Sequence, residues 1–171
     1  MSREPRIILG LDPGIASMGY GALSADGDQL RALTYGCLRT EATTAVPARL
    51  RALFEQLVHL KSMYAFTDVA VESLFYSRNR STAMVVGQAR GVALLATVHE
   101  GVAFGEYTPT AVKEAVAAYG RATKKDVQQM VRMILGLPIL PSPDDAADAL
   151  AVAICHARQS ETARILGRAG L

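Results

Sequence analysis

Four carboxylates that lie far apart in the chain each stand beside a segment with the character of a buried element. Asp12 ends the apolar run at residues 7–11, Glu72 ends the short β-type run at residues 69–71, and Asp145 and Asp148 open a long alanine-rich stretch. The last two are three residues apart and so share one face of a helix. Because an unpaired buried carboxylate is costly, such a cluster indicates a divalent-cation site. Oxygen-only ligands favour Mg²⁺ or Mn²⁺ over zinc.

Each carboxylate also has a simpler interpretation. Asp145 could serve only as a helix cap or a partner of the helix dipole, and Asp144 competes with it for the same place. Asp12 could belong to a simple turn with Pro13 and Gly14, and Glu72 could face solvent at a strand end. Asp148 is harder to explain in this way because alanines and a leucine surround it. The combination favours a metal site.

The elements that must position these residues follow from the hydrophobic pattern. It predicts strands near residues 7–11, 17–23, 30–40, 69–71 and 102–107, and helices near 50–60, 81–99, 110–118, 127–135 and 143–159. Short turns make the first three strands antiparallel neighbours. The sequence therefore predicts an α/β fold with a mixed five-stranded sheet and helices on both faces.

A right-handed crossover would place the first and fourth strands side by side, with Asp12 and Glu72 together at their carboxyl ends. The first turn of the last helix, docked there, would add Asp145 and Asp148. Four carboxylates in one place can hold two divalent ions about 3.5–4 Å apart, as in polymerases and nucleases. One ion would generate the nucleophile from water, and the other would stabilise a leaving 3′ oxygen.

Length and composition set the remaining expectations. The 171 residues predict one domain, with a tail that frays from Ser160. No apolar run approaches the roughly 18–20 residues of a membrane span, and the N-terminus lacks a secretory signal, so we expect a cytoplasmic protein. Cys37 and Cys155 are expected to be buried free thiols. A formal charge of +2 does not by itself indicate a nucleic-acid partner.

Several motifs together resemble the bacterial RuvC Holliday junction resolvases. The resemblance begins with Ile8-Leu9-Gly10-Leu11-Asp12-Pro13-Gly14 and Gly19-Tyr20-Gly21, and continues with Glu72 followed by Leu74-Phe75. Its most specific parts are Gly87-Gln88-Ala89-Arg90-Gly91 and Asp145-Ala146-Ala147-Asp148-Ala149-Leu150-Ala151. It extends over roughly residues 6–156, nearly the whole chain.

This resemblance implies an RNase H-like fold and a homodimer that nicks two strands of like polarity in four-way DNA junctions. The nicks would leave 5′-phosphate and 3′-hydroxyl ends, in recombination and repair, beside a RuvA–RuvB branch-migration complex. The family's catalytic, metal-binding tetrad falls on Asp12, Glu72, Asp145 and Asp148, which favours Asp145 over Asp144. The implied cofactor is Mg²⁺ or Mn²⁺, with two ions in each active site.

The resemblance also places a junction-facing aromatic at Phe75 and functional lysines at Lys113 and Lys124. Beside Phe75, Tyr76 could stack on unpaired bases, although a phenylalanine here could equally be a core residue. Further cations suited to phosphate contact, or otherwise simple surface charges, are Arg78, Arg80, Arg121 and Lys125.

The helix that carries Gly87 and Gly91 is the predicted dimer face, although two glycines four residues apart could also serve packing within the chain. His156 matches a histidine of the family, but it follows a buried apolar run, which favours a hydrogen-bonded core histidine over a catalytic one.

Three other functions compete with a resolvase. An RNase H-like nuclease acting on RNA or as a monomer would keep the acidic cluster without the dimer helix. An actin-like sugar kinase or ATPase has a phosphate loop similar to residues 9–14, but it needs two lobes, for which 171 residues leave no room. A non-catalytic DNA-binding module would not retain four carboxylates that repel DNA.

Overall fold

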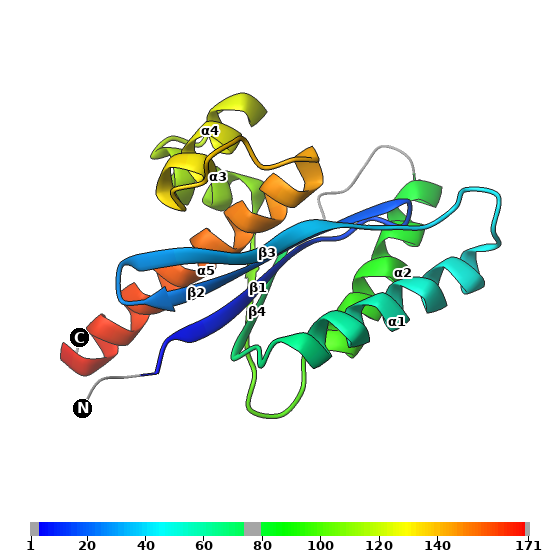
Figure 1. Ribbon diagram of the computed structural model, residues 1–171, viewed down its shortest axis with the longest axis horizontal. Coiled ribbons are helices and arrows are strands. Elements are labelled where there is room, and N and C mark those ends of the chain that lie inside the picture. Colours follow the sequence, from blue (N-terminus) through cyan, green and yellow to red (C-terminus); the bar gives the residue numbers. More distant parts are fainter. Residues whose placement is uncertain (1–3, 74–79, 170–171) are drawn as a thin grey trace.

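The computed structural model describes residues 4–73 and 80–169. Within them, five strands and five helices follow the predicted order (Figure 1). The elements are β1 (Arg6–Asp12), β2 (Ser17–Asp26), β3 (Gln29–Arg39), α1 (Val46–Met63), β4 (Asp68–Glu72), α2 (Arg80–Thr97), β5 (Ala103–Tyr107), α3 (Pro109–Ala117), α4 (Lys124–Ile134) and α5 (Asp144–Ala169).

The five strands form one mixed sheet in the order β3-β2-β1-β4-β5. β1 and β2, and β2 and β3, pair antiparallel, whereas β1 and β4, and β4 and β5, pair parallel. This confirms the antiparallel start of the sheet and the predicted adjacency of the first and fourth strands. Leu11 of β1 is level with Val71 of β4, so the two strands end at the same edge of the sheet.

Helices cover both faces of the sheet (Figure 1): α1 and α2 lie on one face, and α5 with α3 and α4 on the other. Successive side chains of a strand point to opposite faces of the sheet, which explains why β1 contributes residues to the hydrophobic cores on both faces. Ile8 packs into the core under α5, whereas Leu9 and Leu11 pack into the core under α1 and α2. A strand buried on both faces reads as a continuous apolar run, as β1 does.

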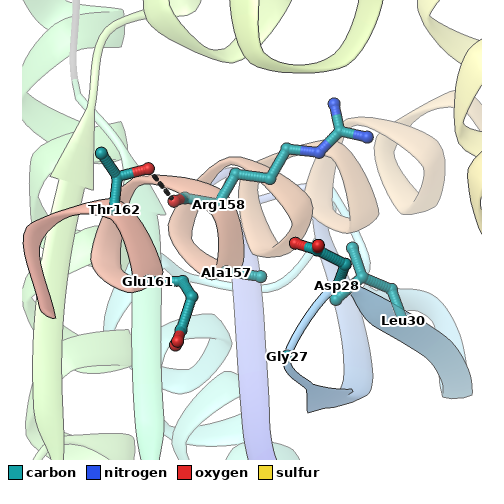
Figure 2. A pocket seen from close by; sticks show the side chains of 7 residues that line it. All are labelled: Gly27, Asp28, Leu30, Ala157, Arg158, Glu161 and Thr162. Carbon is teal, nitrogen blue, oxygen red and sulfur yellow. Dashed lines mark hydrogen bonds between the residues drawn. The ribbon is translucent and has the colours of Figure 1, made fainter. Parts of the chain in front are cut away.

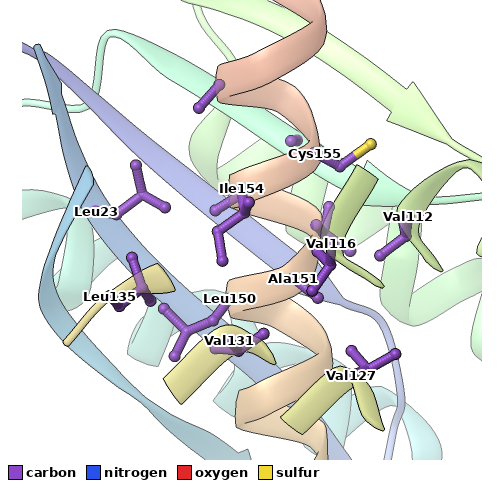
Figure 3. Close-up of a cluster of buried hydrophobic side chains, with 14 of the residues drawn as sticks. Leu23, Val112, Val116, Val127, Val131, Leu135, Leu150, Ala151, Ile154 and Cys155 are labelled. Carbon is purple, nitrogen blue, oxygen red and sulfur yellow. The ribbon is translucent and has the colours of Figure 1, made fainter. Parts of the chain in front are cut away.

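α5 is the central helix of its layer, lying between the sheet and the pair α3 and α4 (Figure 3). Leu150 and Ile154 are fully buried in this core, together with Val116 of α3 and Val131 of α4. Because neighbours surround the helix, it has almost no polar face between Ala146 and Cys155. This explains the alanine-rich stretch of the sequence.

α5 continues to Ala169, well beyond residue 159, where the last helix was predicted to end. The reason is a contact with the start of β1. The guanidinium of Arg6 donates to Oγ of Ser160 at 2.8 Å and also lies 3.8 Å from a carboxylate oxygen of Glu161. A partner far away in the sequence therefore holds a segment that local propensity alone would leave loose.

Arg6 also belongs to a buried polar cluster at the edge of the sheet opposite Asp12 and Glu72. Nε2 of His156 lies 2.9 Å from Oδ1 of Asp68, and Nδ1 of His156 lies 2.8 Å from the hydroxyl of Tyr107. Arg6 reaches the same Oδ1 at 3.1 Å. His156 is 3% exposed and its ring nitrogens are both engaged, which confirms the prediction of a hydrogen-bonded core histidine.

The two cysteines differ in their surroundings, and both are free. Cys155 is fully buried, and burial raises the pKa of its thiol to about 12. Cys37 is only partly buried, so the expectation of two buried thiols is wrong for this residue. It lies on β3 opposite Gly19, next to the first turn of α5.

Candidate metal-dependent active site

The parallel pairing of β1 and β4 brings two of the predicted carboxylates together. Asp12 is the last residue of β1 and Glu72 is the last residue of β4. Since Leu11 and Val71 are level, the two acidic residues leave the sheet side by side. Both line one cavity of about 350 Å³, which Asp148 also lines.

Glycines in the sheet bring the start of α5 to this edge. A Cβ on Gly19 would lie 2.0 Å from the carbonyl oxygen of Asp145, and one on Gly10 would lie 2.1 Å from that of Ala149. No side chain fits at either position, so the helix backbone rests directly on β2 and β1. Gly19 is also the residue opposite Asp12 in the sheet. Asp145 and Asp148 are therefore carried to Asp12 by contact between backbones.

The pKa values of Asp12 and Glu72 are raised first by burial and then by the neighbouring acids. Burial raises the pKa of Asp12 from 3.8 to about 7, with further contributions from the charges of Glu72, Asp148 and Asp145. Burial and then the charge of Asp148 raise the pKa of Glu72. The cluster therefore holds negative charge at a cost, which a bound cation would offset.

Two lysines oppose this charge. Nζ of Lys124 lies 3.1 Å from Oδ2 of Asp148, and this contact raises the pKa of Lys124. Lys113 lines the same cavity, and its charge lowers the pKa of Glu72. Their helices begin at defined points. Thr108 caps α3, and Thr123 forms a capping box with Asp126 at the start of α4.

The two neighbouring aspartates at the start of α5 have different partners. Oδ2 of Asp145 accepts a hydrogen bond from Oγ of Ser17 at 2.5 Å and lies 3.9 Å from Sγ of Cys37. Asp144 is exposed and accepts a hydrogen bond from Nε2 of Gln128 at 2.7 Å. Of these two aspartates, Asp145 and not Asp144 is among the charges that raise the pKa of Asp12.

Sequence reasoning missed Ser17 and Cys37 as neighbours of this site. No motif singles them out, and the only available signal was positional. Ser17 begins the strand that follows the Asp12 turn, and Cys37 lies opposite Gly19, the residue on which α5 rests. Recognising them required the register of β2 and β3 and the close approach of α5.

The donor set suits a hard divalent ion. In the described residues, no three His, Cys, Asp or Glu side chains stand together in an arrangement that could hold a metal ion without moving. The carboxylates instead engage Ser17 and Lys124. They are nevertheless oxygen donors, and their charges help to raise the pKa values of Asp12 and Glu72, which are both partly buried. Mg²⁺ and Mn²⁺ prefer such ligands.

The predicted DNA-contacting residues are distributed unevenly over the structure. Phe75, Tyr76 and Arg78 lie outside the described residues, and Arg80 is the first residue of α2. Lys113 and Lys124 line the acidic cavity, whereas Arg121, just before α4, and Lys125, within α4, are exposed and do not line it. The structure thus groups two of these cations with the carboxylates.

A second hollow, of about 380 Å³, lies toward the far end of α5 (Figure 2). The turn between β2 and β3 and the later part of α5 line it, including Asp28, Arg158 and Glu161. Figure 2 shows Thr162 bonded to the backbone of Arg158 within the same helix. None of the four predicted carboxylates lines this hollow, which therefore does not extend the acidic site.

Comparison with known proteins decides the family. Residues 8–156 match the family model described as crossover junction endodeoxyribonuclease RuvC. The chain belongs to the RuvC family. The crossover junction endodeoxyribonuclease RuvC of Heliobacterium modesticaldum is 54% identical over 151 residues, 88% of this chain and 93% of that protein. The RuvC of Rubrobacter xylanophilus is 51% identical, over 91% of this chain and 87% of that protein.

Solved structures agree with this assignment. The structure described as T. thermophilus RuvC in complex with Holliday junction substrate has a TM-score of 0.87 and 33% identity, and the match covers 92% of this chain and 96% of that one. A second T. thermophilus RuvC structure has a TM-score of 0.81 and 34% identity, with 93% and 96% covered. The RNase H-like fold predicted from the resemblance is confirmed.

Membership of the RuvC family makes this chain an endodeoxyribonuclease, and it implies a dependence on divalent metal ions. Among the described residues, no helix is both long enough and apolar enough to span a membrane.

Proposed function

We propose that this protein resolves four-way DNA junctions by nicking two strands of like polarity, leaving 5′-phosphate and 3′-hydroxyl ends. The observation that carries the proposal is the shared cavity of Asp12, Glu72 and Asp148 at the end of an RNase H-like sheet, beside Asp145. The Holliday junction bound to the T. thermophilus relative supports four-way DNA as the substrate. As an enzyme of chromosomal recombination and repair, it would act in the cytoplasm as a single domain.

In this proposal, the catalytic and metal-binding residues are Asp12, Glu72, Asp145 and Asp148. Two bound Mg²⁺ or Mn²⁺ ions would supply the charge that activates a water and stabilises the leaving 3′ oxygen. Asp12, whose pKa is about 7, must lose its proton to become a full ligand. Lys124 must leave Asp148, which is possible because the lysine side chain is 69% exposed. Once released from Asp148, the ammonium group of Lys124 would be free to contact the scissile phosphate.

The proposed DNA surface surrounds the acidic cavity. Lys113 and Lys124 would contact the phosphate nearest the cleaved bond, and the aromatic rings of Phe75 and Tyr76 would stack on bases unpaired at the junction. Further phosphate contacts would come from Arg78, Arg80, Arg121 and Lys125. Cations are needed here because the carboxylates would otherwise repel the DNA backbone.

We also propose a homodimer formed through α2. Gly91 is open, with nothing within 4 Å of the position its Cβ would take, and Gly87 lies one turn earlier. Met84 and Leu95 share a face with Gly91 and are 69% and 76% exposed. An apolar helix face with an open glycine allows close approach of a second copy. A two-fold dimer would supply two active sites for two symmetric cuts, and a RuvA–RuvB complex would be its partner on the junction.

A cleavage assay tests the proposal. The protein is incubated with an end-labelled synthetic four-way junction and with a linear duplex of matched sequence, in Mg²⁺, Mn²⁺ or EDTA. We expect paired, ligatable nicks in the junction alone and none in EDTA. Asp145→Asn should abolish cleavage and retain junction binding, whereas the matched variant Asp144→Asn should cleave normally, because Asp144 is exposed and bonded to Gln128.

Other outcomes would point to the competing functions. Cleavage of the duplex or of RNA hybrids at a similar rate would indicate a general RNase H-like nuclease. Tight junction binding without a cut in either metal would indicate a DNA-binding module. Equal losses in Asp144→Asn and Asp145→Asn would contradict the assignment of the site.

A further inference from the structure

Ser17 makes the shortest described contact to any of the four carboxylates. Its hydroxyl donates to Oδ2 of Asp145 at 2.5 Å, a length typical of a hydrogen bond to a charged oxygen. The thiol of Cys37 lies 3.9 Å from the same oxygen. Both described contacts of this carboxylate therefore fall on Oδ2.

The backbone that carries Ser17 is held firmly. Ser17 is the first residue of β2 and pairs with Arg39 of β3. The preceding loop is tied to Thr40, whose Oγ1 donates to the carbonyl of Ile15 at 2.6 Å and whose N–H donates to that of Ala16 at 3.2 Å. The hydroxyl of Ser17 thus projects from a fixed point, two residues before Gly19, on which the backbone of Asp145 rests.

Asp145 needs such a partner because its neighbours repel it. Its charge helps to raise the pKa of Asp12, and the same repulsion acts in return on Asp145. Asp145 also lies in the first turn of α5, where its side chain could turn toward solvent. A donor on the sheet keeps the carboxylate beside the cavity.

The two aspartates of α5 are held in different ways. Asp148 is held by Lys124, a charged and exposed side chain that an arriving cation must displace. Asp145 is held by a neutral hydroxyl that neither cancels its charge nor competes with a cation. The hydroxyl occupies Oδ2 and leaves the other carboxylate oxygen available as a ligand.

We propose that Ser17 is a positioning residue that holds Asp145 for metal binding. This inference rests on the proposed function, in which Asp145 is a metal ligand. Hydrogen-bonding partners of metal ligands typically contribute about 10–100-fold to metal affinity or activity. Loss of the Ser17 hydroxyl should therefore weaken metal binding while leaving the fold intact.

The test measures Mn²⁺ binding without DNA, by the electron paramagnetic resonance signal of free Mn²⁺ during a titration of the full-length protein. Four variants are compared with the wild type: Ser17→Ala, Ser17→Thr, Ser24→Ala and Asp145→Asn. Ser24 is the matched control because it lies on the same strand, opposite Ile7 and away from the acidic cavity. Thermal unfolding of each metal-free variant checks that it is folded.

We expect Mn²⁺ affinity to fall about 10-fold or more in Ser17→Ala and to return to within about threefold of wild type in Ser17→Thr, which keeps the hydroxyl. Ser24→Ala should bind as wild type. The cleavage defect of Ser17→Ala should shrink as Mn²⁺ is raised, since the metal site is weakened and the chemistry is retained.

Two results would overturn the inference alone: wild-type affinity in Ser17→Ala, or a threonine variant no better than alanine, while Asp145→Asn binds poorly. Wild-type Mn²⁺ affinity in Asp145→Asn would instead overturn the proposed role of Asp145 itself, and the inference with it.

Discussion

Replacing Asp12 by asparagine should stabilise the metal-free protein while it abolishes cleavage. Asp12 is partly buried among Glu72, Asp145 and Asp148, and these surroundings disfavour its charged form. Asparagine has nearly the same shape and carries no charge. The variant therefore removes a metal ligand and, at the same time, the repulsion that the ligand creates in the absence of metal.

The magnitude follows from the shift of the Asp12 pKa from 3.8 to about 7. Each unit corresponds to about 1.4 kcal/mol, so the ionised carboxylate costs the folded state about 4 kcal/mol above pH 7. The folded state binds the proton more tightly than the unfolded state, so wild-type stability falls as the pH rises from about 4 to about 7 and is then level. The advantage of asparagine should be small at pH 4, under about 2 kcal/mol at pH 5 and at most about 4 kcal/mol at pH 8.

Urea denaturation in EDTA at pH 5 and pH 8 measures this difference. Asp144→Asn is the control, since it removes a charge from an exposed aspartate next in sequence to the acidic cluster and should change the free energy of unfolding by about 0.5 kcal/mol or less. Added Mn²⁺ should stabilise the wild type more than Asp12→Asn. Equal stabilities of wild type and Asp12→Asn at pH 8, or a gain that does not grow from pH 5, would refute the argument from repulsion.

Three further changes test how the site is built and supported. Gly19→Ala would place a Cβ 2.0 Å from the backbone of α5, so it should cost about 3 kcal/mol in urea denaturation and weaken cleavage. Lys124→Ala should lower the cleavage rate at least 10-fold with junction binding nearly kept. Asp68→Asn breaks a buried ion pair and should cost about 3 kcal/mol at pH 7, with wild-type cleavage at saturating metal.

The Asp68 variant also makes a prediction about acid unfolding. Burial alone would raise the pKa of Asp68, but hydrogen bonds from His156 and Thr67 and the charge of Arg6 bring it below its ordinary value. Its stabilising contribution is therefore present at neutral pH and is lost as the pH falls below about 4. Circular dichroism during acid titration should show a smaller loss of stability below pH 4 in Asp68→Asn than in the wild type.

Much of the sheet could be predicted because its information is local. The apolar run before Asp12 and the short run before Glu72 are strands in the structure, and the turn at Gly27 joins two antiparallel strands. The adjacency of the first and fourth strands followed from a general rule on the handedness of crossovers. The meeting of Asp12 and Glu72 at one edge was therefore available from the sequence.

The sequence also determined, through its motifs, which family the chain belongs to and which carboxylates to examine. It could not separate Asp144 from Asp145 by spacing, because both lie in the first turn of α5. The tertiary structure distinguishes their surroundings. The backbone of α5 packs against Gly19, and this contact fixes the rotation of the helix about its axis. At that rotation Asp145 accepts a hydrogen bond from Ser17, whereas Asp144 accepts one from Gln128.

Long-range contacts decided the remaining features. Nothing near Ser160 indicates a helix that continues to Ala169, because the residue that secures it, Arg6, is more than 150 positions away. In the same way, the hydroxyl of Ser17 and the amine of Lys124 become partners of the acidic site only when β2 and α4 pack against α5. Periodicity and turn chemistry act over a few residues, whereas the register of packed backbones sets which side chains meet.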